Sequence, residues 1–520
     1  MSWLSPAVTK AIVFAVVSLL AIVIGVQLAD PLGTTSMGLG GSLALLLLFP
    51  FLLKHHHLIL ALTWNSALFV FFLPGSPPAG FVMVFISLGA SVLIRTINKQ
   101  ASFTNVKELT GPLVCLACVV VVTAMARGGV GFRFLGGESN GGKQTIFILA
   151  AIVGYFAFSI RPTSLVRAPL FSALFALGAT TQIVASLVQL AGGPLDFLTM
   201  FFNIDLLSYQ LASGPNSFAR YAGLSRACLA IVGFILLRYG IRGTLDIGKP
   251  FRLLFFLGAT FLTLFGGFRS GIIFVVMLLS ALFFLEGLWR TKWAVIMSGF
   301  AVVLLVAIVV FSRQLPLQIQ RSLAFLPVDI SPDARLDADQ SSEWRIDIWK
   351  AVLPEVPQYL LLGKGYGINA TDVYLAPFLI EQGVYRNHEA AILTGNYHQG
   401  LLSLLIPLGL PGLICFGWLI LAGFRVLIGN LRNGDPTLRT INRYLLSLFS
   451  VQLLFFCFIY GHFSADIATF CGILGLSVSL NSRTEPARNA VHQLEKAGPS
   501  SVGRQPAFSR TGAAATASAK

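Results

Sequence analysis

The sequence predicts an all-α membrane protein, a polytopic transmembrane helical bundle of about 14 (12 to 14) spans with one large external loop containing short helices. The first observation behind this class is composition. Of the 520 residues, 56% are hydrophobic and only 11% are charged, too few for the surface of a soluble globule. The second is that apolar runs of about 16 to 22 residues recur, each long enough to cross a hydrocarbon core of ~30 Å as a helix.

The predicted spans follow these apolar runs along the chain. The first run has no small-residue cleavage site, so we interpret it as a span rather than a signal peptide. The spans are residues 11–29, 39–53, 58–73, 79–94, 111–126, 145–160, 170–190, 221–238, 251–267, 271–288, 293–312, 400–424, 444–460 and 465–480. All six cysteines fall inside these spans, which favours small apolar side chains over a disulfide framework.

The basic residues predict the orientation of the bundle. A formal net charge of +15 could indicate a nucleic-acid partner, but its distribution follows the positive-inside rule. Seven alternate connections hold 17 Lys and Arg residues, whereas the opposite short loops hold five: Arg127, Arg133, Lys143, Arg220 and Arg269. We therefore expect no nucleic acid, both termini in the cytoplasm, and the long hydrophilic loop outside.

The spans divide the chain into four regions. These are residues 1–312, an N-terminal transmembrane region of about 11 spans; 313–399, the external loop; 400–480, about three further spans; and 481–520, a tail. The loop holds ten acidic and seven basic residues, and insertions of this length usually carry function. Its segment SSEWRIDIWKAV predicts a helix whose apolar face, with two tryptophans, suits the membrane interface. The tail has no apolar periodicity, and we expect it to be disordered.

Two polar motifs match known sites only in part. GGESNGGKQT lacks the Ser or Thr that a phosphate loop needs after Lys143, so a flexible loop is the better interpretation. His55, His56 and His57 follow Lys54 between two predicted spans, which favours an interfacial turn over a metal cluster. No acidic metal cluster stands out, so we expect neither a metal nor a cofactor.

Three arginines mark the predicted outer face. Arg269 stands between two apolar runs, where a permanent charge faces either a polar cavity or the headgroups. Arg345 lies on the tryptophan-rich loop helix, where, taken alone, a solvated position or a pair with Asp347 or Glu343 is the simpler interpretation. Arg220 precedes the start of a span on the same side.

A histidine motif opens the first span after the loop. His398 and Gln399 are followed by nine residues and then by Gly409 and Gly412, which gives the pattern H-Q-x9-G-x-x-G. A lone interfacial histidine is usually without a chemical role, but the whole pattern is harder to dismiss, although helix packing alone explains the glycines equally well. Two glycines three residues apart on a helix also let another helix or a lipid tail approach closely.

These motifs, in this order, resemble those of the bacterial O-antigen ligase and polymerase superfamily, integral membrane glycan transferases. The resemblance covers about residues 214–424, and an outer loop followed by three spans is also the family's layout. Members often have nine spans before the loop, where we count eleven, and Ile273 stands where the family has Leu. The matching segments are GPNSFARY, FRSGII, RIDIW with the downstream LLGKGYG, and HQ-x9-GLPG.

The resemblance implies transfer of an undecaprenyl-diphosphate-linked glycan to an acceptor hydroxyl, on lipid A core or a growing polysaccharide, at the outer face of the bacterial inner membrane. The reaction would need no metal. Membrane lipids and envelope polysaccharide assembly proteins are the other expected partners. We expect Arg269, Arg345 and, less strongly, Arg220 to bind the diphosphate, and His398 to act as the general base. Tyr397 and Gln399 would orient the base or the acceptor, and Gly409 and Gly412 would line a groove below it.

Other functions stay open at this point. A polymerase of the same superfamily would use the same chemistry, with the growing glycan as acceptor, and a protein side chain is a third acceptor. A lipid-linked oligosaccharide flippase would place its charges near the bilayer midplane, often in repeated halves. A non-catalytic assembly protein would not depend on His398 or the arginines.

Overall fold

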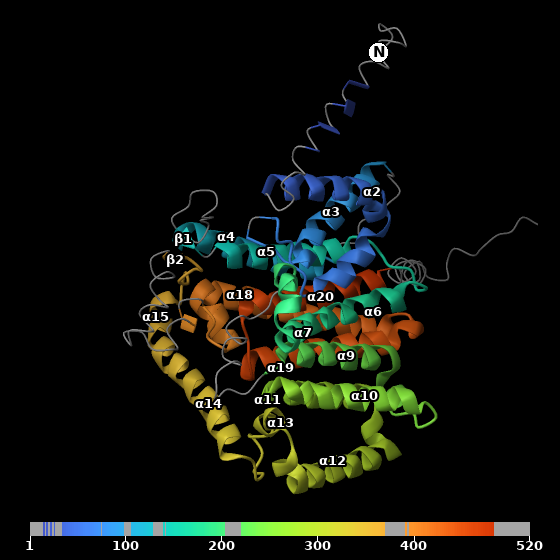
Figure 1. Cartoon of the computed structure of the whole chain (residues 1–520), viewed down its shortest axis with the longest axis vertical. Coiled ribbons are helices and arrows are strands. Elements are labelled where there is room, and N and C mark those ends of the chain that lie inside the picture. The colour runs from blue at the N-terminus through green and yellow to red at the C-terminus, as the bar shows by residue number, and fades with distance from the viewer. Residues whose placement is uncertain are drawn as a thin grey trace, which may run out of the picture.

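The computed structural model describes residues 34–73, 75–97, 106–127, 139–140, 142–202, 220–369, 391–392 and 395–482, together with isolated residues between 14 and 25. These residues are almost entirely helical, as Figure 1 shows, and the predicted class of all-α polytopic membrane protein is confirmed. Strand structure in the described part is limited to a short antiparallel pair, β1 (Ser139–Asn140) and β2 (Ile368–Asn369). This pair ties the start of α5 to the long loop.

The helices are named in chain order, with η for 3-10 helices. They are α2 (Thr34–Trp64), α3 (Ala79–Ile97), α4 (Lys107–Arg127), α5 (Gly142–Ser159), α6 (Ala168–Leu177), η2 (Gly178–Gln182), α7 (Ile183–Ala191), η3 (Gly193–Met200), α9 (Ala222–Thr244), α10 (Pro250–Thr263), η4 (Leu264–Gly266), α11 (Arg269–Leu285), η5 (Leu288–Arg290), α12 (Lys292–Phe311), η6 (Ser312–Gln314), α13 (Leu317–Ser322), α14 (Pro332–Val352), η7 (Leu353–Glu355), α15 (Val356–Tyr359), α18 (Gly400–Asn433), η8 (Pro436–Leu438), α19 (Arg439–Phe458) and α20 (Phe463–Asn481).

Membrane-crossing segments account for most of these helices. Within the described residues, nine helical segments are long and apolar enough to cross a membrane, and Pro250–Gly266 and Arg269–Leu285 are shorter apolar helices. Each of the eleven predicted spans from 79–94 onward coincides with one helical segment, although 170–190 is divided by η2. The predicted span 11–29 lies largely outside the described residues, as does nearly all of the tail.

The prediction of two spans at 39–53 and 58–73 is wrong, because α2 runs unbroken from Thr34 to Trp64. The histidines expected in a turn lie inside this helix. His56 Nδ1 forms a 2.8 Å hydrogen bond with Ser87 Oγ, and His57 Nε2 donates to the Phe158 carbonyl at 3.0 Å. These partners on α3 and α5 satisfy polar side chains that would otherwise favour leaving the helix. The merger removes one predicted crossing.

The bundle core lies where α2, α5 and α20 meet. Gly154 of α5 and Gly472 of α20 both face Trp64, and a Cβ at either position would lie 2.2 Å from the indole. Small residues thus allow these helices to approach closely, as is common within membranes. At the end of α18 opposite His398, Asn442 and Asn481 exchange side-chain hydrogen bonds of 3.0 Å in both directions.

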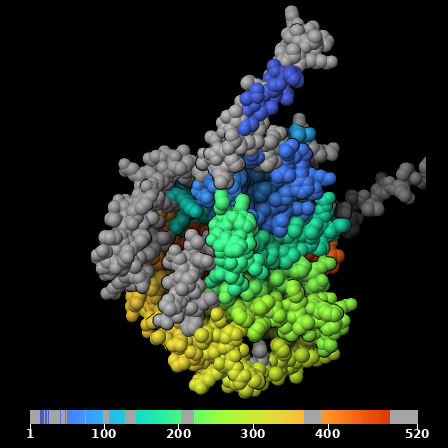
Figure 2. Space-filling view, in the orientation of Figure 1, coloured from blue at the N-terminus to red at the C-terminus, as the bar shows by residue number. Residues whose placement is uncertain are grey.

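The long loop folds as short helices along one side of the bundle. In Figure 1, α14 descends from α15, beside α18, towards α13 and α12. Figure 2 shows the yellow atoms of this part of the chain along the lower edge of the molecule, adjoining the green surface of α9 to α11. The predicted loop helix is therefore present and longer than expected, since α14 begins at Pro332 rather than near Ser341.

Candidate active site

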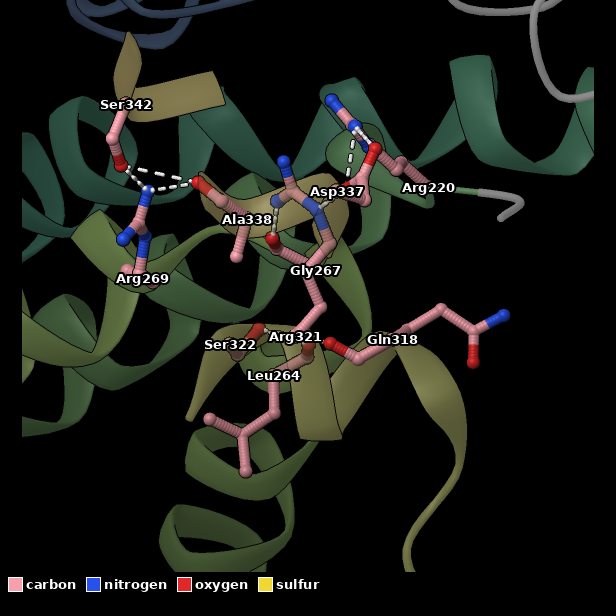
Figure 3. Close-up of polar contacts among 10 residues, drawn as sticks. All are labelled: Arg220, Leu264, Gly267, Arg269, Gln318, Arg321, Ser322, Asp337, Ala338 and Ser342. Carbon is pink, nitrogen blue, oxygen red and sulfur yellow. Dashed lines mark hydrogen bonds and ion pairs between the residues drawn. The ribbon is translucent and has the colours of Figure 1, made fainter. Parts of the chain in front are cut away.

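Arg269 is the first residue of α11, after the turn that ends α10. Gly267 has φ +67°, a left-handed conformation that glycine adopts readily because it lacks a Cβ. Arg269 Nη2 donates to the Ala338 carbonyl at 2.9 Å and to Ser342 Oγ at 2.8 Å (Figure 3). Both partners belong to α14. Arg269 therefore faces the loop helix rather than the lipid headgroups.

Arg220 binds the same helix at Asp337, the residue directly before Ala338. Its Nη2 donates to both carboxylate oxygens of Asp337, at 3.0 and 3.1 Å. Asp337 also accepts a hydrogen bond from Arg321 of α13, which in turn donates to the Gly267 carbonyl (Figure 3). Burial and the Arg321 charge lower the pKa of Arg220, whereas Asp337 raises it. Two arginines thus share one carboxylate beside Arg269.

Arg345 lies on α14 beyond these contacts. Its Nε is buried and has no hydrogen-bond partner among the described residues. In this part of the chain neither Asp347 nor Glu343, both exposed, forms an ion pair with it. Burial lowers the pKa of Arg345, and the charges of Arg269 and Arg321 add to the shift. The local pair that the sequence offered as the simpler interpretation is absent.

His398 occupies the connection that leads into α18. Its backbone is left-handed, with φ +54°, and its ring lies between Trp344 and Tyr460, with centroid separations of 4.8 and 5.0 Å. Within the described structure its buried Nδ1 has no hydrogen-bond partner. Burial, the Arg345 charge and the His462 charge together lower the pKa of His398 to about 4. The imidazole is therefore neutral at pH 7 and able to accept a proton.

Charge connects the residues that the sequence predicts for the site. Arg345 is the leading charged cause of the shift at His398, and Arg269 is the leading charged cause of the shift at Arg345. Such effects act over short distances in a partly buried site. The structure therefore brings His398, Arg345 and Arg269 into one electrostatic environment, to which Arg220 is joined through Arg321.

Tyr397 and Gln399, the residues on either side of His398, have structural contacts. Tyr397 is buried with Ile348 and Val352 of α14, and its carbonyl accepts a 3.0 Å hydrogen bond from Trp349 Nε1. Gln399 caps α18: its Oε1 accepts from Leu402 N at 2.5 Å, and its Nε2 donates to the Cys457 carbonyl at 3.1 Å. Both residues fix the backbone of His398 rather than contact its ring.

Gly409 does not line a groove on a continuous helix as predicted. It interrupts α18 with φ +67°, and the freed carbonyls of Ile406 and Pro407 accept hydrogen bonds from Lys364 N and Gly365 N at 2.7 and 2.9 Å. The LLGKGYG segment therefore docks into the break. A Cβ at Gly409 would lie 2.9 Å from the Leu360 carbonyl, so only glycine fits this approach.

Gly412 lies just past the break, and a Cβ there would meet Leu408 of the same helix at 2.4 Å. An apolar cleft opens elsewhere, beside Gln399. Its volume is about 450 Å³, and its walls come from α14, η7, α18 and α19. It is lined by Trp349, Leu353, Gln399, Leu401, Leu402, Leu405, Cys457 and Phe458.

Sequence reasoning missed four residues of the site: Arg321, Asp337, Tyr460 and His462. The first two lie in the long loop without any recognisable spacing. The other two fall in the short connection between α19 and α20, where Asp466 accepts a 2.7 Å hydrogen bond from His462 N. His462 itself was visible as a second histidine at a predicted span end. Among the described residues, no group of three or more His, Cys, Asp or Glu side chains is placed to hold a metal.

Comparison with known families finds a similarity for part of the chain. No curated protein matches it. A family model described as O-antigen ligase matches residues 253–417, from α10 to the middle of α18. The matched region contains Arg269, Arg345 and His398, and Arg220 lies outside it. Residues 253–417 of this chain are therefore similar to the O-antigen ligase family.

Proposed function

We propose that this protein transfers a glycan from undecaprenyl diphosphate to an acceptor hydroxyl at the outer face of the bacterial inner membrane. Arg269 and Arg345, with Arg220 as a further ligand, bind the diphosphate, and His398 is the general base. The observation that carries the proposal is a neutral buried imidazole beside arginines that outnumber their carboxylate partners among the described residues. In this proposal the C-terminus lies in the cytoplasm, three crossings after the external loop.

The arginines suit the leaving group. Breaking the bond between the anomeric carbon and the diphosphate oxygen builds negative charge on that oxygen, and fixed guanidinium groups stabilise it. Arg345 has a buried Nε without a protein partner in the described structure, so it can donate to a phosphate without breaking an existing bond. Arg269 is held in place by Ala338 and Ser342 through one nitrogen, Nη2.

His398 suits the acceptor. A sugar hydroxyl is a poor nucleophile until a base takes its proton, and only the neutral imidazole can do so. As the hydroxyl oxygen attacks the anomeric carbon, the proton passes to His398 and the diphosphate leaves with the bonding electrons. In the free enzyme, the positive charge of Arg345 is one cause of the lowered pKa of His398. The negative charge of a bound donor offsets that positive charge. Donor binding therefore strengthens the base, and a single displacement inverts the anomeric centre.

The apolar cleft beside Gln399 supports a lipid-linked donor. Its lining of leucine, tryptophan and phenylalanine side chains is suited to an isoprenoid chain that arrives from the bilayer. Its lining includes Gln399, the residue after His398, so in this proposal an isoprenoid chain held there carries the diphosphate at the end nearer the histidine. This geometry favours an enzyme over a flippase, whose charges would lie near the midplane.

The test is transfer by the purified full-length protein in proteoliposomes with an undecaprenyl-diphosphate-linked glycan. We expect His398→Ala to lose transfer by about 10²-fold or more, the contribution typical of a general base. The matched control is His55→Ala on α2, which should transfer normally. Near-normal transfer by correctly folded His398→Ala would refute the base assignment. The product separates two acceptors: a ladder of glycan lengths indicates a polymerase, and a single attached chain indicates a ligase.

A further inference from the structure

Arg321 is the most buried charged side chain of the arginine cluster. Only 4% of its side-chain surface is exposed, against 34% for Arg220 and 29% for Asp337. It donates to Asp337 and to the Gly267 carbonyl, so it joins three separate segments of the chain (Figure 3). Its Nε and Nη1 are both used in these contacts. Arg321 is therefore placed to hold its neighbours and not to bind substrate.

The Asp337 carboxylate is committed to Arg321. A buried guanidinium without a counterion is strongly destabilising, so the pair is expected to persist whether or not a donor is bound. The same carboxylate accepts both hydrogen bonds from Arg220 Nη2. Arg220, which is more exposed than Arg321, is thus held by a carboxylate whose own position is fixed by Arg321.

The second contact of Arg321 acts on Arg269. The Gly267 carbonyl lies two residues before Arg269, in the left-handed turn that opens α11. Arg269 in turn donates to the Ala338 carbonyl, the residue directly after Asp337. One buried side chain therefore sets both the start of α11 and the facing part of α14.

We propose that Arg321 and Asp337 are positioning residues for donor binding: Asp337 fixes Arg220, and Arg321 fixes the turn that precedes Arg269. This inference rests on the proposed function, because it assumes that these arginines meet the donor. Asp337 acts on the donor only through Arg220. Asp337 does not compete with the donor for Arg220 and move away when the donor binds, because Arg321 would then be left buried without its counterion.

A double-mutant cycle tests this arrangement in proteoliposomes, with donor concentration varied at saturating acceptor. We expect Asp337→Asn and Arg220→Ala each to raise the donor KM about tenfold with kcat little changed, as for the loss of one charge-assisted hydrogen bond. The double variant should be no worse than either single variant, because both remove the same interaction. The matched control is Asp329→Asn, which breaks the exposed Arg313–Asp329 pair and should leave KM unchanged.

Three results would overturn the inference. Multiplied effects in the double variant would mean that Asp337 acts independently of Arg220. A lower donor KM in Asp337→Asn would show that the carboxylate competes with the donor, and an unchanged KM in Arg220→Ala would remove Arg220 from the site. If Asp337→Asn does not fold, Asp337→Glu replaces it, since it keeps the charge for Arg321 but displaces Arg220. Failure of the proposed function is distinct, because the wild-type protein would then show no transfer.

Discussion

The imidazole of His398 lies edge-on against the indole of Trp344, with ring centroids 4.8 Å apart and planes inclined by 75°. Trp344 precedes Arg345 on α14. One helix therefore supplies both an aromatic contact to the His398 ring and the charge that lowers the pKa of His398 most. The same helix holds Arg269 through Ser342. The orientation of α14 therefore decides whether base and arginines face a common space.

The pH dependence of transfer should report His398. Its pKa is lowered to about 4 from 6.5, first by burial and then by the Arg345 charge. Because the neutral form is the base, kcat/KM should stay constant from pH 7 down to about 5 and fall only below that, as the free enzyme takes up its proton. In Arg345→Met one cause of the lowering is gone, so the acid limb should move to higher pH even though the rate falls.

The measurement is kcat/KM against pH in proteoliposomes for the wild type and Arg345→Met. Arg313→Met is the control, since this exposed arginine does not contribute to the lowered pKa of His398, and the acid limb of this variant should coincide with that of the wild type. An acid limb near 6.5 in the wild type, or no movement in Arg345→Met, would contradict the environment described for His398.

Ser342 should contribute modestly through Arg269. Its hydroxyl accepts a 2.8 Å hydrogen bond from Arg269 Nη2, and the Ala338 carbonyl would remain as a partner after its removal. We expect Ser342→Ala to lower kcat/KM about three- to tenfold by raising donor KM, the range of one ordinary hydrogen bond, because the Ala338 carbonyl still holds Arg269. Ser341→Ala, one residue away, serves as the control and should behave as wild type. Equal kcat/KM values for Ser342→Ala and Ser341→Ala would show that the bond between Ser342 and Arg269 does not contribute to donor binding.

The sequence predicted those parts of the site that depend on local pattern. Arg269 could be placed because a charge between two apolar runs has few alternatives, and His398 because it heads a spaced motif. The Arg321–Asp337 pair could not be predicted, since its partners are joined only by the packing of α13 against α14. His462 is visible in the sequence as a histidine at a predicted span end, but its approach to His398 could not be predicted, because it depends on where α19 ends and α20 begins.

Two errors have a common physical origin. Polar histidines after Lys54 suggest a turn unless their partners are known, and those partners, Ser87 and the Phe158 carbonyl, lie on other helices. Gly409 resembles a packing glycine in sequence, but its positive φ lets a distant loop segment enter the helix. A sequence pattern gives residue type and period, and it does not show which tertiary partner a residue meets.

Gly409→Ala should impair both stability and transfer. The left-handed conformation costs a residue with a Cβ about 1–2 kcal/mol, and the added atom would also lie 2.9 Å from the Leu360 carbonyl. We expect a lower Tm in detergent and loss of transfer, because the LLGKGYG segment could no longer dock beside the start of α18. Gly417→Ala in the same helix is the control, since a Cβ there meets nothing within 4 Å. Indistinguishable Tm values would refute the docked arrangement.

The packing of α4 against α18 can be checked by cross-linking without any activity assay. Cys115 and Cys415, 300 residues apart in the chain, place their Sγ atoms 2.9 Å from each other, and Cys118 is exposed on another part of α4. A membrane-permeant oxidant that accepts two electrons should join the two thiols, with release of two protons, in the otherwise unmodified protein. Mass spectrometry should then find a linked peptide pair containing Cys115 and Cys415. The pair should persist in Cys118→Ser and vanish in Cys415→Ser; a product linking Cys118 to Cys415 instead would mean that α4 is rotated from the arrangement described. Because α18 carries the break into which the loop docks, that rotation would also displace the segment beneath His398.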